Sequence, residues 1–258
     1  MGARLMAGVD GVLAGKIRTY ARPVAAGKAN FGHCPICAGA TLFVEVGPYL
    51  RNDYRCIRCD SIPRWRALIT VLEREFPDWR HLQIHESSPS GPASRKLRRE
   101  AVHYTSSQFL SGHPGGSVVD GITCQDLESL TFPDRSLDLV ITQDVLEHLL
   151  DPERAVVEIA RVLRPGGAHV FTVPIFAGRP TLVRAAASGS GVDYLLPADY
   201  HGNPVDPNGS LVVREWGDDL VEFVARATGL PTEVHTVRDR RRGLDGEFLD
   251  VLVTRKPV

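Results

Sequence analysis

Short apolar runs alternate with amphipathic segments from about residue 67 to the end of the chain. Apolar residues at helical spacing predict helices over 65–76, 92–101, 153–163 and 216–229. Compact apolar runs predict strands over 81–86, 102–105, 137–142, 168–174, 230–237 and 247–255. Strands that alternate with helices in this way indicate an α/β fold with a mainly parallel sheet.

The composition is that of an ordinary globular protein. The chain has 258 residues, of which 43% are hydrophobic and 24% charged, which excludes collagen, a coiled-coil rod and wholesale disorder. No apolar run is long enough to span a membrane. Charged residues interrupt the mildly apolar N-terminal stretch, so we expect neither a signal peptide nor a membrane partner. We expect the protein to be cytoplasmic.

Positive charge is concentrated in the N-terminal quarter. Residues 1–66 carry ten Lys and Arg against four Asp and Glu, a net charge of +6 that leaves −7 for the rest of a chain whose total is −1. Such a split is typical of a basic module that meets an anionic partner such as nucleic acid. A solvated basic surface without a partner remains the alternative.

Four of the five cysteines form two tight pairs. Cys34 and Cys37 lie in CPIC, Cys56 and Cys59 lie in CIRC, and eighteen residues separate the pairs. This spacing indicates a structural zinc site with four thiolate ligands and no open position for catalysis. The apolar stretch between the pairs suits a small hairpin, and the arrangement resembles a zinc ribbon. We expect loss of a ligand to unfold this ribbon and to leave the rest of the chain largely intact.

Ligands of open parallel sheets bind at the carboxyl ends of the strands. In this chain those ends are the loops 86–91, 105–108, 124–128, 143–148 and 174–180. Several of these loops carry polar residues that suit a nucleoside ligand.

One long stretch resembles a known family. Residues 125–174 resemble class I S-adenosylmethionine-dependent methyltransferases of the type 11 group. The match comprises an acidic loop residue, an LPF-like triplet, D-x-S-x-D-L-V, E-H-x-x-D-P and R-V-L-x-P-G-G, here Asp126, Leu130–Phe132, Asp134–Val140, Glu147–Pro152 and Arg161–Gly167. The resemblance implies a Rossmann-like seven-stranded methyltransferase sheet and S-adenosylmethionine as the cofactor.

The resemblance also implies roles for residues in these loops. Asp126 is expected to accept the adenine amino group, with the Leu127 backbone beside it; a loop-capping role is the alternative. Gln143 and Asp144 are expected to line the methionine arm and the methyl group. His148 is expected one helical turn after Asp144, on the same face and close to the acceptor, with packing against the sheet as the alternative.

Two loops depart from the family pattern. The first loop normally has three glycines, but here it reads HESSPSGP, so Ser87 and Ser88 are expected to contact the cofactor and Glu86 to pair with its ammonium group. The acidic residue that would hold the ribose hydroxyls is missing after the next strand, and Ser106 and Ser107 are there instead. Neutral groups bind a diol less strongly than a carboxylate does.

A long irregular segment at about 175–215 is expected to cover the acceptor pocket. It contains DYHGNP, in which His201 is a candidate general base, oriented by Tyr200 or Asn203. His148 is the alternative base. A histidine that only satisfies the loop backbone remains an open alternative.

The predicted organisation is an N-terminal extension at 1–30, a zinc ribbon at 31–66 and a methyltransferase-like domain at 67–258. Three functions compete. The first is methyl transfer to a small-molecule or saccharide-type acceptor. The second is methylation of RNA or protein, with the basic ribbon presenting the macromolecule. The third is a non-catalytic interaction protein with a methyltransferase fold, which the loss of glycines in the first loop favours.

Overall fold

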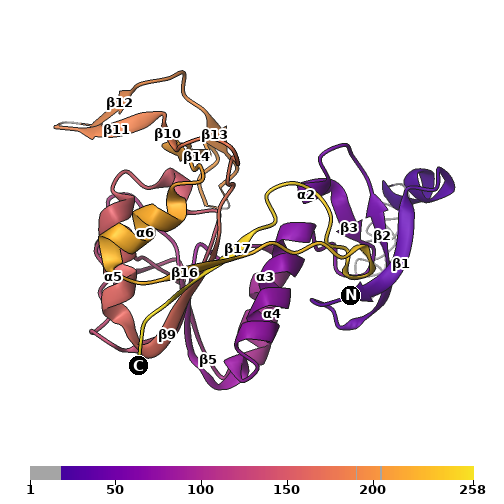
Figure 1. Ribbon diagram of the computed structural model, residues 1–258, viewed down its shortest axis with the longest axis horizontal. Coiled ribbons are helices and arrows are strands. Elements are labelled where there is room, and N and C mark those ends of the chain that lie inside the picture. The colour runs from indigo at the N-terminus through magenta and orange to yellow at the C-terminus, as the bar shows by residue number, and fades with distance from the viewer. Residues whose placement is uncertain (1–18, 190, 204) are drawn as a thin grey trace, which may run out of the picture.

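A six-stranded mixed sheet forms the centre of the protein (Figure 1). The computed structural model describes residues 19–189, 191–203 and 205–258, so residues 1–18 of the predicted extension lie outside the described residues. The strand order is β16 (Thr232–His235), β17 (Val251–Arg255), β9 (Leu163–Thr172), β8 (Leu137–Gln143), β4 (Gln83–Ser87) and β5 (His103–Ser107). All neighbouring strands are parallel except β17, which is antiparallel to both of its neighbours. This is a Rossmann-like α/β sheet with a mainly parallel core, as the sequence predicts.

The sheet has six strands where the resemblance implies seven. Beyond β5, a single parallel bridge joins Gln108 to Cys124 at the edge of the sheet. The two-residue strands β6 (Val118–Val119) and β7 (Ile122–Thr123) pair with each other instead. The intervening SGHPGGS is rich in glycine and contains a proline, which disfavours a continuous strand.

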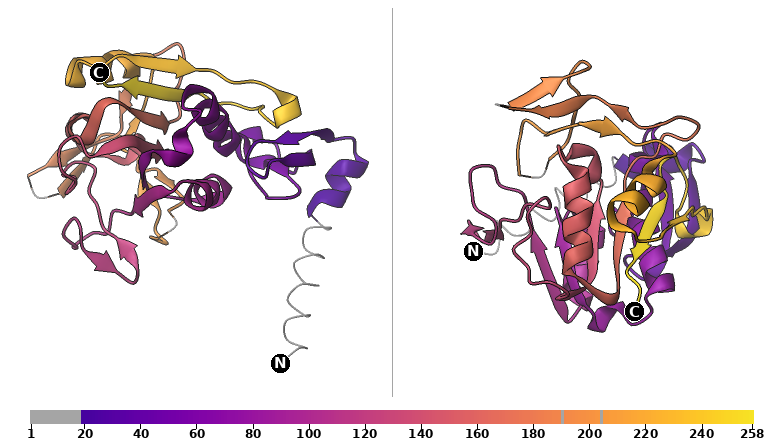
Figure 2. Two further views of the ribbon diagram at one scale, coloured as in Figure 1. Left: turned by 90° about the horizontal axis from the view of Figure 1, so that it is seen from below. Right: turned by 60° about the vertical axis from the view of Figure 1, so that its left-hand side comes forward.

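Helices cover both faces of the sheet (Figures 1 and 2). On one face, α3 (Pro63–Glu75) and α4 (Gly91–Glu100) pack in a core with residues of β4, β8, β9 and β17. On the other face, α5 (Pro152–Val162) and α6 (Leu220–Thr228) cover two smaller cores. Asp151 caps α5 by accepting from the Arg154 N–H at 3.0 Å. Among the described residues, no helix combines the length and the apolar character that crossing a bilayer requires.

A small antiparallel sheet precedes α3. It contains β1 (Ala29–Cys34), β2 (Gly39–Glu45) and β3 (Tyr54–Cys56), with the single-turn α2 (Leu50–Asp53) between the last two; we call residues 29–61 the cysteine module. Its apolar residues belong to the same core cluster as α3 and the central sheet. The module and the sheet therefore share one hydrophobic core.

The C-terminal segment holds the module against the sheet (Figures 1 and 2). Between β16 and β17, the chain leaves the sheet, forms η3 (Arg240–Arg242) and reaches the module. The Asn30 side chain donates to the Arg240 carbonyl at 2.7 Å, and the buried Arg51 donates to the Phe248 carbonyl at 3.1 Å. Residues about 200 positions apart in the sequence are thus in contact. These contacts hold the module in place, although the sequence predicts it as a separate unit.

The segment at 175–215 is more regular than the sequence predicts. Its short strands form three two-stranded antiparallel ladders, which are β10 (Leu182–Val183) with β15 (Arg214–Glu215), β11 (Ala185–Ser188) with β12 (Gly191–Tyr194), and β13 (Tyr200–His201) with β14 (Ser210–Leu211). The β11–β12 hairpin projects from the molecule (Figure 1). The β13–β14 ladder brings His201 back toward the carboxyl end of the central sheet.

Gly91 at the start of α4 provides the first testable prediction. Its φ is +70°, and a Cβ there would overlap the ring of Trp65. We expect Gly91→Ala to lower the free energy of unfolding by about 1–2 kcal/mol through the left-handed backbone and by about 1–3 kcal/mol more through the overlap. Chemical denaturation measures the sum of these two costs as the change in the free energy of unfolding.

Gly178 is the matched control, because its φ is +83° and no atom lies within 4 Å of the added Cβ. Gly178→Ala is expected to show only the backbone cost. Equal destabilisation by the two substitutions would disprove the contact between Gly91 and Trp65.

Candidate functional site

A cavity of about 1110 Å³ opens at the carboxyl ends of the parallel strands. Residues from all five loops that the sequence singles out line it. The cysteine module and the segment 199–212 contribute further walls. The cavity therefore joins three parts of the chain that are far apart in the sequence.

Six of the residues predicted to contact the cofactor line this cavity: Ser87, Ser88, Asp126, Leu127, Gln143 and Asp144. Ser88 has a left-handed backbone with φ +55°, and its N–H donates to the Ser107 carbonyl at 2.8 Å. One Asp126 oxygen accepts from the Glu128 N–H at 2.9 Å and caps its own turn. This turn fixes the carboxylate at the wall of the cavity, so capping and ligand binding are compatible at this residue.

Glu86 lies behind the cavity wall and does not line it. The residue is fully buried, and its carboxylate accepts hydrogen bonds from Ser94 at 2.6 Å, Tyr104 at 2.6 Å and Gln143 at 2.7 Å. Burial raises the pKa of Glu86, while these three donors oppose the shift. In this structure the Glu86 carboxylate is engaged by these three donors and orients Gln143, which does line the cavity, so the pairing of Glu86 with the cofactor's ammonium stays a prediction.

Ser106 and Ser107 also lie outside the cavity lining. Ser107 is buried, and its hydroxyl lies 3.0 Å from Nε2 of His85, which occupies a glycine position of the family pattern. Ser106 is 3.4 Å from an Arg98 nitrogen. Gln108, the residue that follows β5, lines the cavity, so contacts of Ser106 and Ser107 with the cofactor stay a prediction.

Asp144 lines the cavity together with two arginines of the N-terminal region, Arg51 and Arg64. Arg51 donates to both carboxylate oxygens at 2.8 Å, Arg64 forms a second ion pair, and Thr172 donates at 2.9 Å. Burial alone would raise the pKa of Asp144, but the two arginines outweigh it and lower the pKa to about 2. Asp144 is therefore a fixed anion, and the sequence gives no sign of either arginine partner.

The backbone after β8 is not the predicted helical turn. Asp144 has φ +53°, and only the short η2 (Leu146–His148) follows before α5 begins at Pro152. Asp144 and His148 still line the same cavity.

Glu147, His148 and His201 lie close together in the lining of the same cavity. A Glu147 oxygen is 3.8 Å from Nε2 of His148 and 4.0 Å from Nδ1 of His201. The Glu147 side chain is 3% exposed, and neither oxygen has a hydrogen-bond partner. Burial and the nearby Asp144 raise the pKa of Glu147 well above its ordinary value, and burial lowers the pKa of His148.

The orientation of His201 differs from the prediction. Asn203 donates to the Ser210 hydroxyl and accepts from two backbone N–H groups, so its side chain is used within the loop. The His201 ring instead meets the His148 ring edge-on, with centroids 5.2 Å apart. The two histidines that the sequence treats as alternatives therefore lie side by side.

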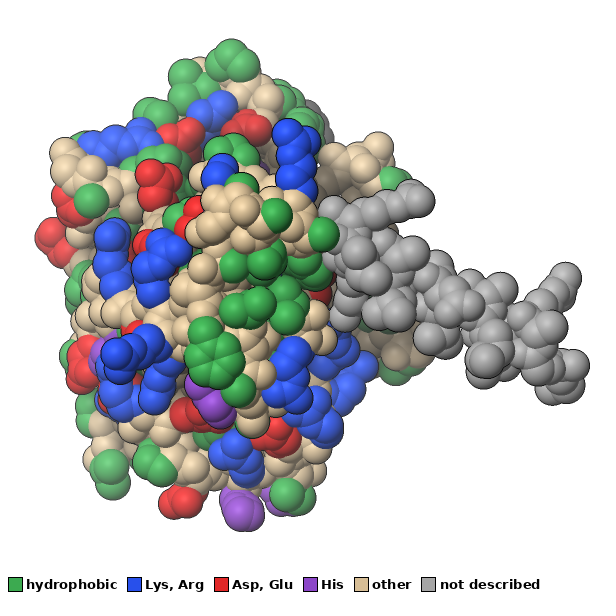
Figure 3. Space-filling view, turned by 90° about the vertical axis from the view of Figure 1, so that its right-hand side faces the viewer, with side chains coloured by type: hydrophobic (Ala, Val, Ile, Leu, Met, Phe, Trp, Pro, Cys, Tyr) green, Lys and Arg blue, Asp and Glu red, His purple; other side chains and the backbone are tan. Residues whose placement is uncertain are grey.

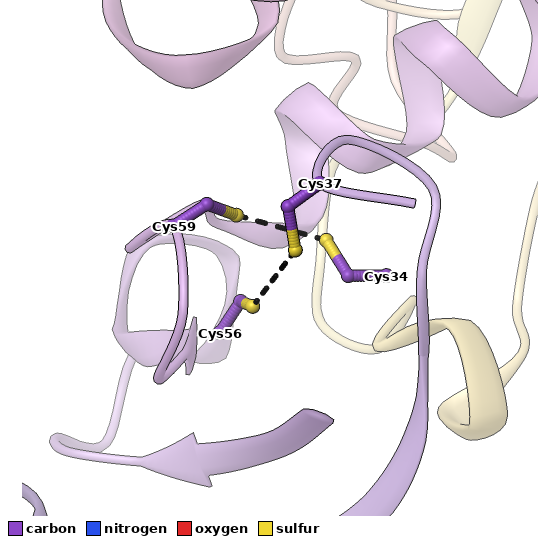
Figure 4. A group of neighbouring side chains, drawn as sticks. All are labelled: Cys34, Cys37, Cys56 and Cys59. Carbon is purple, nitrogen blue, oxygen red and sulfur yellow. Dashed lines mark hydrogen bonds between the residues drawn. The ribbon is translucent and has the colours of Figure 1, made fainter. Parts of the chain in front are cut away.

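The four paired cysteines converge in the module (Figure 4). Cys34 and Cys59 sulfurs are 3.7 Å apart, Cys37 and Cys56 sulfurs are 3.9 Å apart, and all four lie within 4.8 Å of one another. A tetrahedron with Zn–S bonds of about 2.3 Å has sulfurs about 3.8 Å apart. The donor set and its dimensions therefore fit one zinc ion.

The positive charge of residues 1–66 is only partly at the surface. Arg51 and Arg66 are buried, and Arg64 lines the cavity. Lys and Arg side chains nevertheless gather on the face that carries the module (Figure 3). The C-terminal segment adds exposed arginines beside the module, namely Arg238, Arg240, Arg241 and Arg242.

Sequence comparison connects this fold and cavity with methyltransferases. Residues 98–171 match the model of a family described as a methyltransferase domain. A dimethylglycine N-methyltransferase of Parasynechococcus marenigrum is 29% identical over 124 residues, 46% of this chain and 41% of the relative. A malonyl-[acyl-carrier protein] O-methyltransferase of Methylococcus capsulatus is 33% identical over 86 residues, 33% of this chain and 30% of the relative. The chain thus spans less than half the length of these curated relatives.

Solved methyltransferase structures resemble the chain more distantly. A 1,6-didemethyltoxoflavin-N1-methyltransferase of Burkholderia thailandensis aligns over 76% of this chain and 79% of its own, with 14% identity and a TM-score of 0.47. An S-adenosylmethionine-dependent methyltransferase of Mesorhizobium loti aligns over 74% of this chain and 98% of its own, with 18% identity and a TM-score of 0.48.

Proposed function

We propose that the protein transfers a methyl group from S-adenosylmethionine to a small-molecule acceptor. The observation that carries this proposal is one cavity whose lining includes both the Asp126 loop and the histidine pair. The match of residues 98–171 to a methyltransferase domain supports it. The name of one relative, dimethylglycine N-methyltransferase, also refers to a small-molecule acceptor.

The lining of the cavity suits S-adenosylmethionine. Asp126 offers a carboxylate for the adenine amino group, and Leu127 offers apolar contact beside it. Gln108 and the hydroxyls of Ser87 and Ser88 offer hydrogen bonds for the ribose and the amino-acid part. The cofactor supplies an activated methyl group on its sulfonium, which the polar wall at Gln143 and Asp144 would face.

The contribution of the chain is mainly to position two reactants. Glu86 holds Gln143, and two arginines with Thr172 hold Asp144, so both side chains are fixed before a ligand arrives. Such fixed geometry accounts for much of the rate of a two-substrate transfer. His148 and His201 line the same cavity, where a free imidazole nitrogen would accept a proton from a hydroxyl or an ammonium group.

Two alternatives keep specific support. The arginines on the module face (Figure 3) favour an RNA or protein acceptor, because anionic partners bind basic surfaces. The replacement of glycines by His85 and Ser87 in the first loop favours a non-catalytic protein. The residues of the segment 199–212 that line the cavity add a further wall to it, which favours a small acceptor.

We propose further that the four cysteines hold a structural zinc ion. All four positions are thiolates, so no coordination position is left for a substrate. The ion would fix the module that delivers Arg51 to Asp144. The predicted domain boundaries remain a proposal; the shared core favours a single cooperative unit.

Asp126 provides the direct test of the cofactor assignment. Asp126→Asn keeps an oxygen for the Glu128 N–H but presents an amide donor to the adenine amino group. We expect affinity for S-adenosylmethionine to fall by about 1.5–3 kcal/mol, because a hydrogen bond to a charged group is lost. Titration calorimetry measures this as a roughly ten- to hundredfold increase in Kd.

Asp193→Ala is the control, since Asp193 is exposed in the projecting β11–β12 hairpin. Its Kd is expected to equal that of the unmodified protein. Tight binding by Asp126→Asn would overturn the assignment of the adenine site, and no binding by the unmodified protein would favour the non-catalytic alternative.

A further inference from the structure

We propose that Glu147, His148 and His201 form a second metal site, which takes a divalent first-row transition ion at the wall of the cavity. One ligand atom from each of the three residues lies within 4.8 Å of the other two. Two imidazoles and a carboxylate are a ligand set that binds zinc, manganese and iron. This site contains no cysteine and is distinct from the cysteine cluster.

The first argument is the state of the Glu147 carboxylate. Both oxygens are buried at the cavity wall and lack a hydrogen-bond donor, although the side chain is only 3% exposed. Buried polar atoms are nearly always paired, and a buried carboxylate without a partner is costly. Among the described residues, the ionisable nitrogens within 4.0 Å of the carboxylate are those of His148 and His201. A cation between these nitrogens and the carboxylate would satisfy it.

The second argument is the orientation of His148. Its Nδ1 lies 2.8 Å from the Leu211 carbonyl, which can only accept, so Nδ1 carries the proton and Nε2 has a free lone pair. Nε2 is the nitrogen that faces Glu147. Metal-binding histidines almost always donate their other N–H to a carbonyl or carboxylate, which fixes the tautomer and the ring.

The third argument is access. His201 lies in the β13–β14 ladder and is 45% exposed, so it forms an open side of the cluster. Ligand atoms around an ion at about 2.0–2.1 Å are about 3–3.4 Å apart, which requires these side chains to approach by about 1 Å. Three protein ligands leave open positions toward the cavity, where an oxygen or nitrogen of the acceptor can bind. Only this last point rests on the proposed function.

The metal site changes the role of the histidines. A nitrogen that binds an ion cannot also accept a proton from the acceptor. His148 and His201 would then hold the ion and orient the acceptor rather than act as bases.

The test measures metal binding in the absence of cofactor and acceptor, so its failure is separate from failure of methyl transfer. The chain is first loaded with one zinc ion at the cysteine cluster. Mn²⁺, which disfavours thiolates, is then titrated and free Mn²⁺ is followed by electron paramagnetic resonance. A second Zn²⁺ is titrated in parallel against a chromophoric chelator. We expect one further ion per chain.

Three variants locate the ion. Glu147→Gln and His201→Ala are each expected to weaken its binding by more than about 100-fold, since loss of an outer-shell partner alone costs about 10–100-fold. His201→Ala changes an exposed loop residue, so it remains informative if Glu147→Gln fails to fold. His235→Ala is the matched control, because His235 belongs to the other carboxylate–imidazole group, where Arg74 and Arg255 already contact His235 and Glu75.

Each result decides the proposal. Loss of the second ion in His201→Ala, and in Glu147→Gln where that variant folds, with retention in His235→Ala, supports it. The proposal fails if neither Mn²⁺ nor a second Zn²⁺ binds, if His201→Ala binds as the unmodified protein does, or if His235→Ala removes the ion.

Discussion

Cys56→Ser is expected to release the zinc ion and to unfold more of the protein than the cysteine module. The buried Cys34 and Cys56 belong to the same apolar cluster as Ile84, Leu139 and Val251 of the central sheet. Structural zinc contributes about 10–16 kcal/mol of apparent binding free energy in small zinc modules, comparable with a net folding stability of about 5–15 kcal/mol. Metal analysis and far-ultraviolet circular dichroism measure the two losses.

Cys124→Ser is the matched control. Cys124 is also buried, but it lies at the sheet edge and outside the metal cluster. This variant is expected to keep its zinc and its helical signal. If Cys56→Ser lost zinc but kept the full helical signal and cooperativity of the main sheet, the module would be an independent unit, as the sequence alone predicts.

Arg51→Ala is expected to lower the free energy of unfolding by about 3 kcal/mol, because it leaves one partner of a buried ion pair. Arg51 is 4% exposed and bonds both Asp144 oxygens and the Phe248 carbonyl. The cost stays at the low end of the range for buried pairs, since Arg64 and Thr172 still contact Asp144. Denaturant titration measures the stability.

Arg99→Ala removes an arginine from an exposed pair and serves as the control. Arg99 is 63% exposed beside Glu100, so its loss is expected to cost no more than about 1 kcal/mol. Equal costs for the two substitutions would mean that the cysteine module does not support the cavity wall through Arg51.

The sequence predicts the central sheet well because each of its elements leaves a local pattern. Apolar runs mark β4, β8 and β9, and Asp151 with Pro152 marks the start of α5. The doubled cysteine spacing likewise predicts a cluster that the structure brings within 4.8 Å. Features encoded over a few neighbouring residues are therefore recovered.

Features that depend on distant pairs are not recovered. Arg51 and Asp144 are 93 residues apart, and Arg66 and Gly243 are 177 residues apart. The residues around Arg51 in the sequence, YLRND, give no indication that its side chain lines a cavity at the edge of the central sheet. Glu147 is visible in the family pattern beside His148, but its burial without a partner is a property of the packed cavity.

The predicted site residues differ from the cavity lining where a backbone shift of one or two residues decides which side chain faces the cavity. Glu86 and Ser107 alternate with Ser87 and Gln108 at the ends of β4 and β5, and only the latter two line the cavity. Period-two alternation along a strand turns successive side chains to opposite faces. Sequence alone fixes the loop but not the register of its contacts.

A crystal structure of the protein with S-adenosylhomocysteine tests the central claim most directly. We predict that the adenine amino group lies within hydrogen-bond distance of Asp126. The sulfur is predicted to lie at the wall formed by Gln143 and Asp144, on the side toward His148. A ligand bound outside this cavity, or one inside it with its adenine remote from Asp126, would contradict the account.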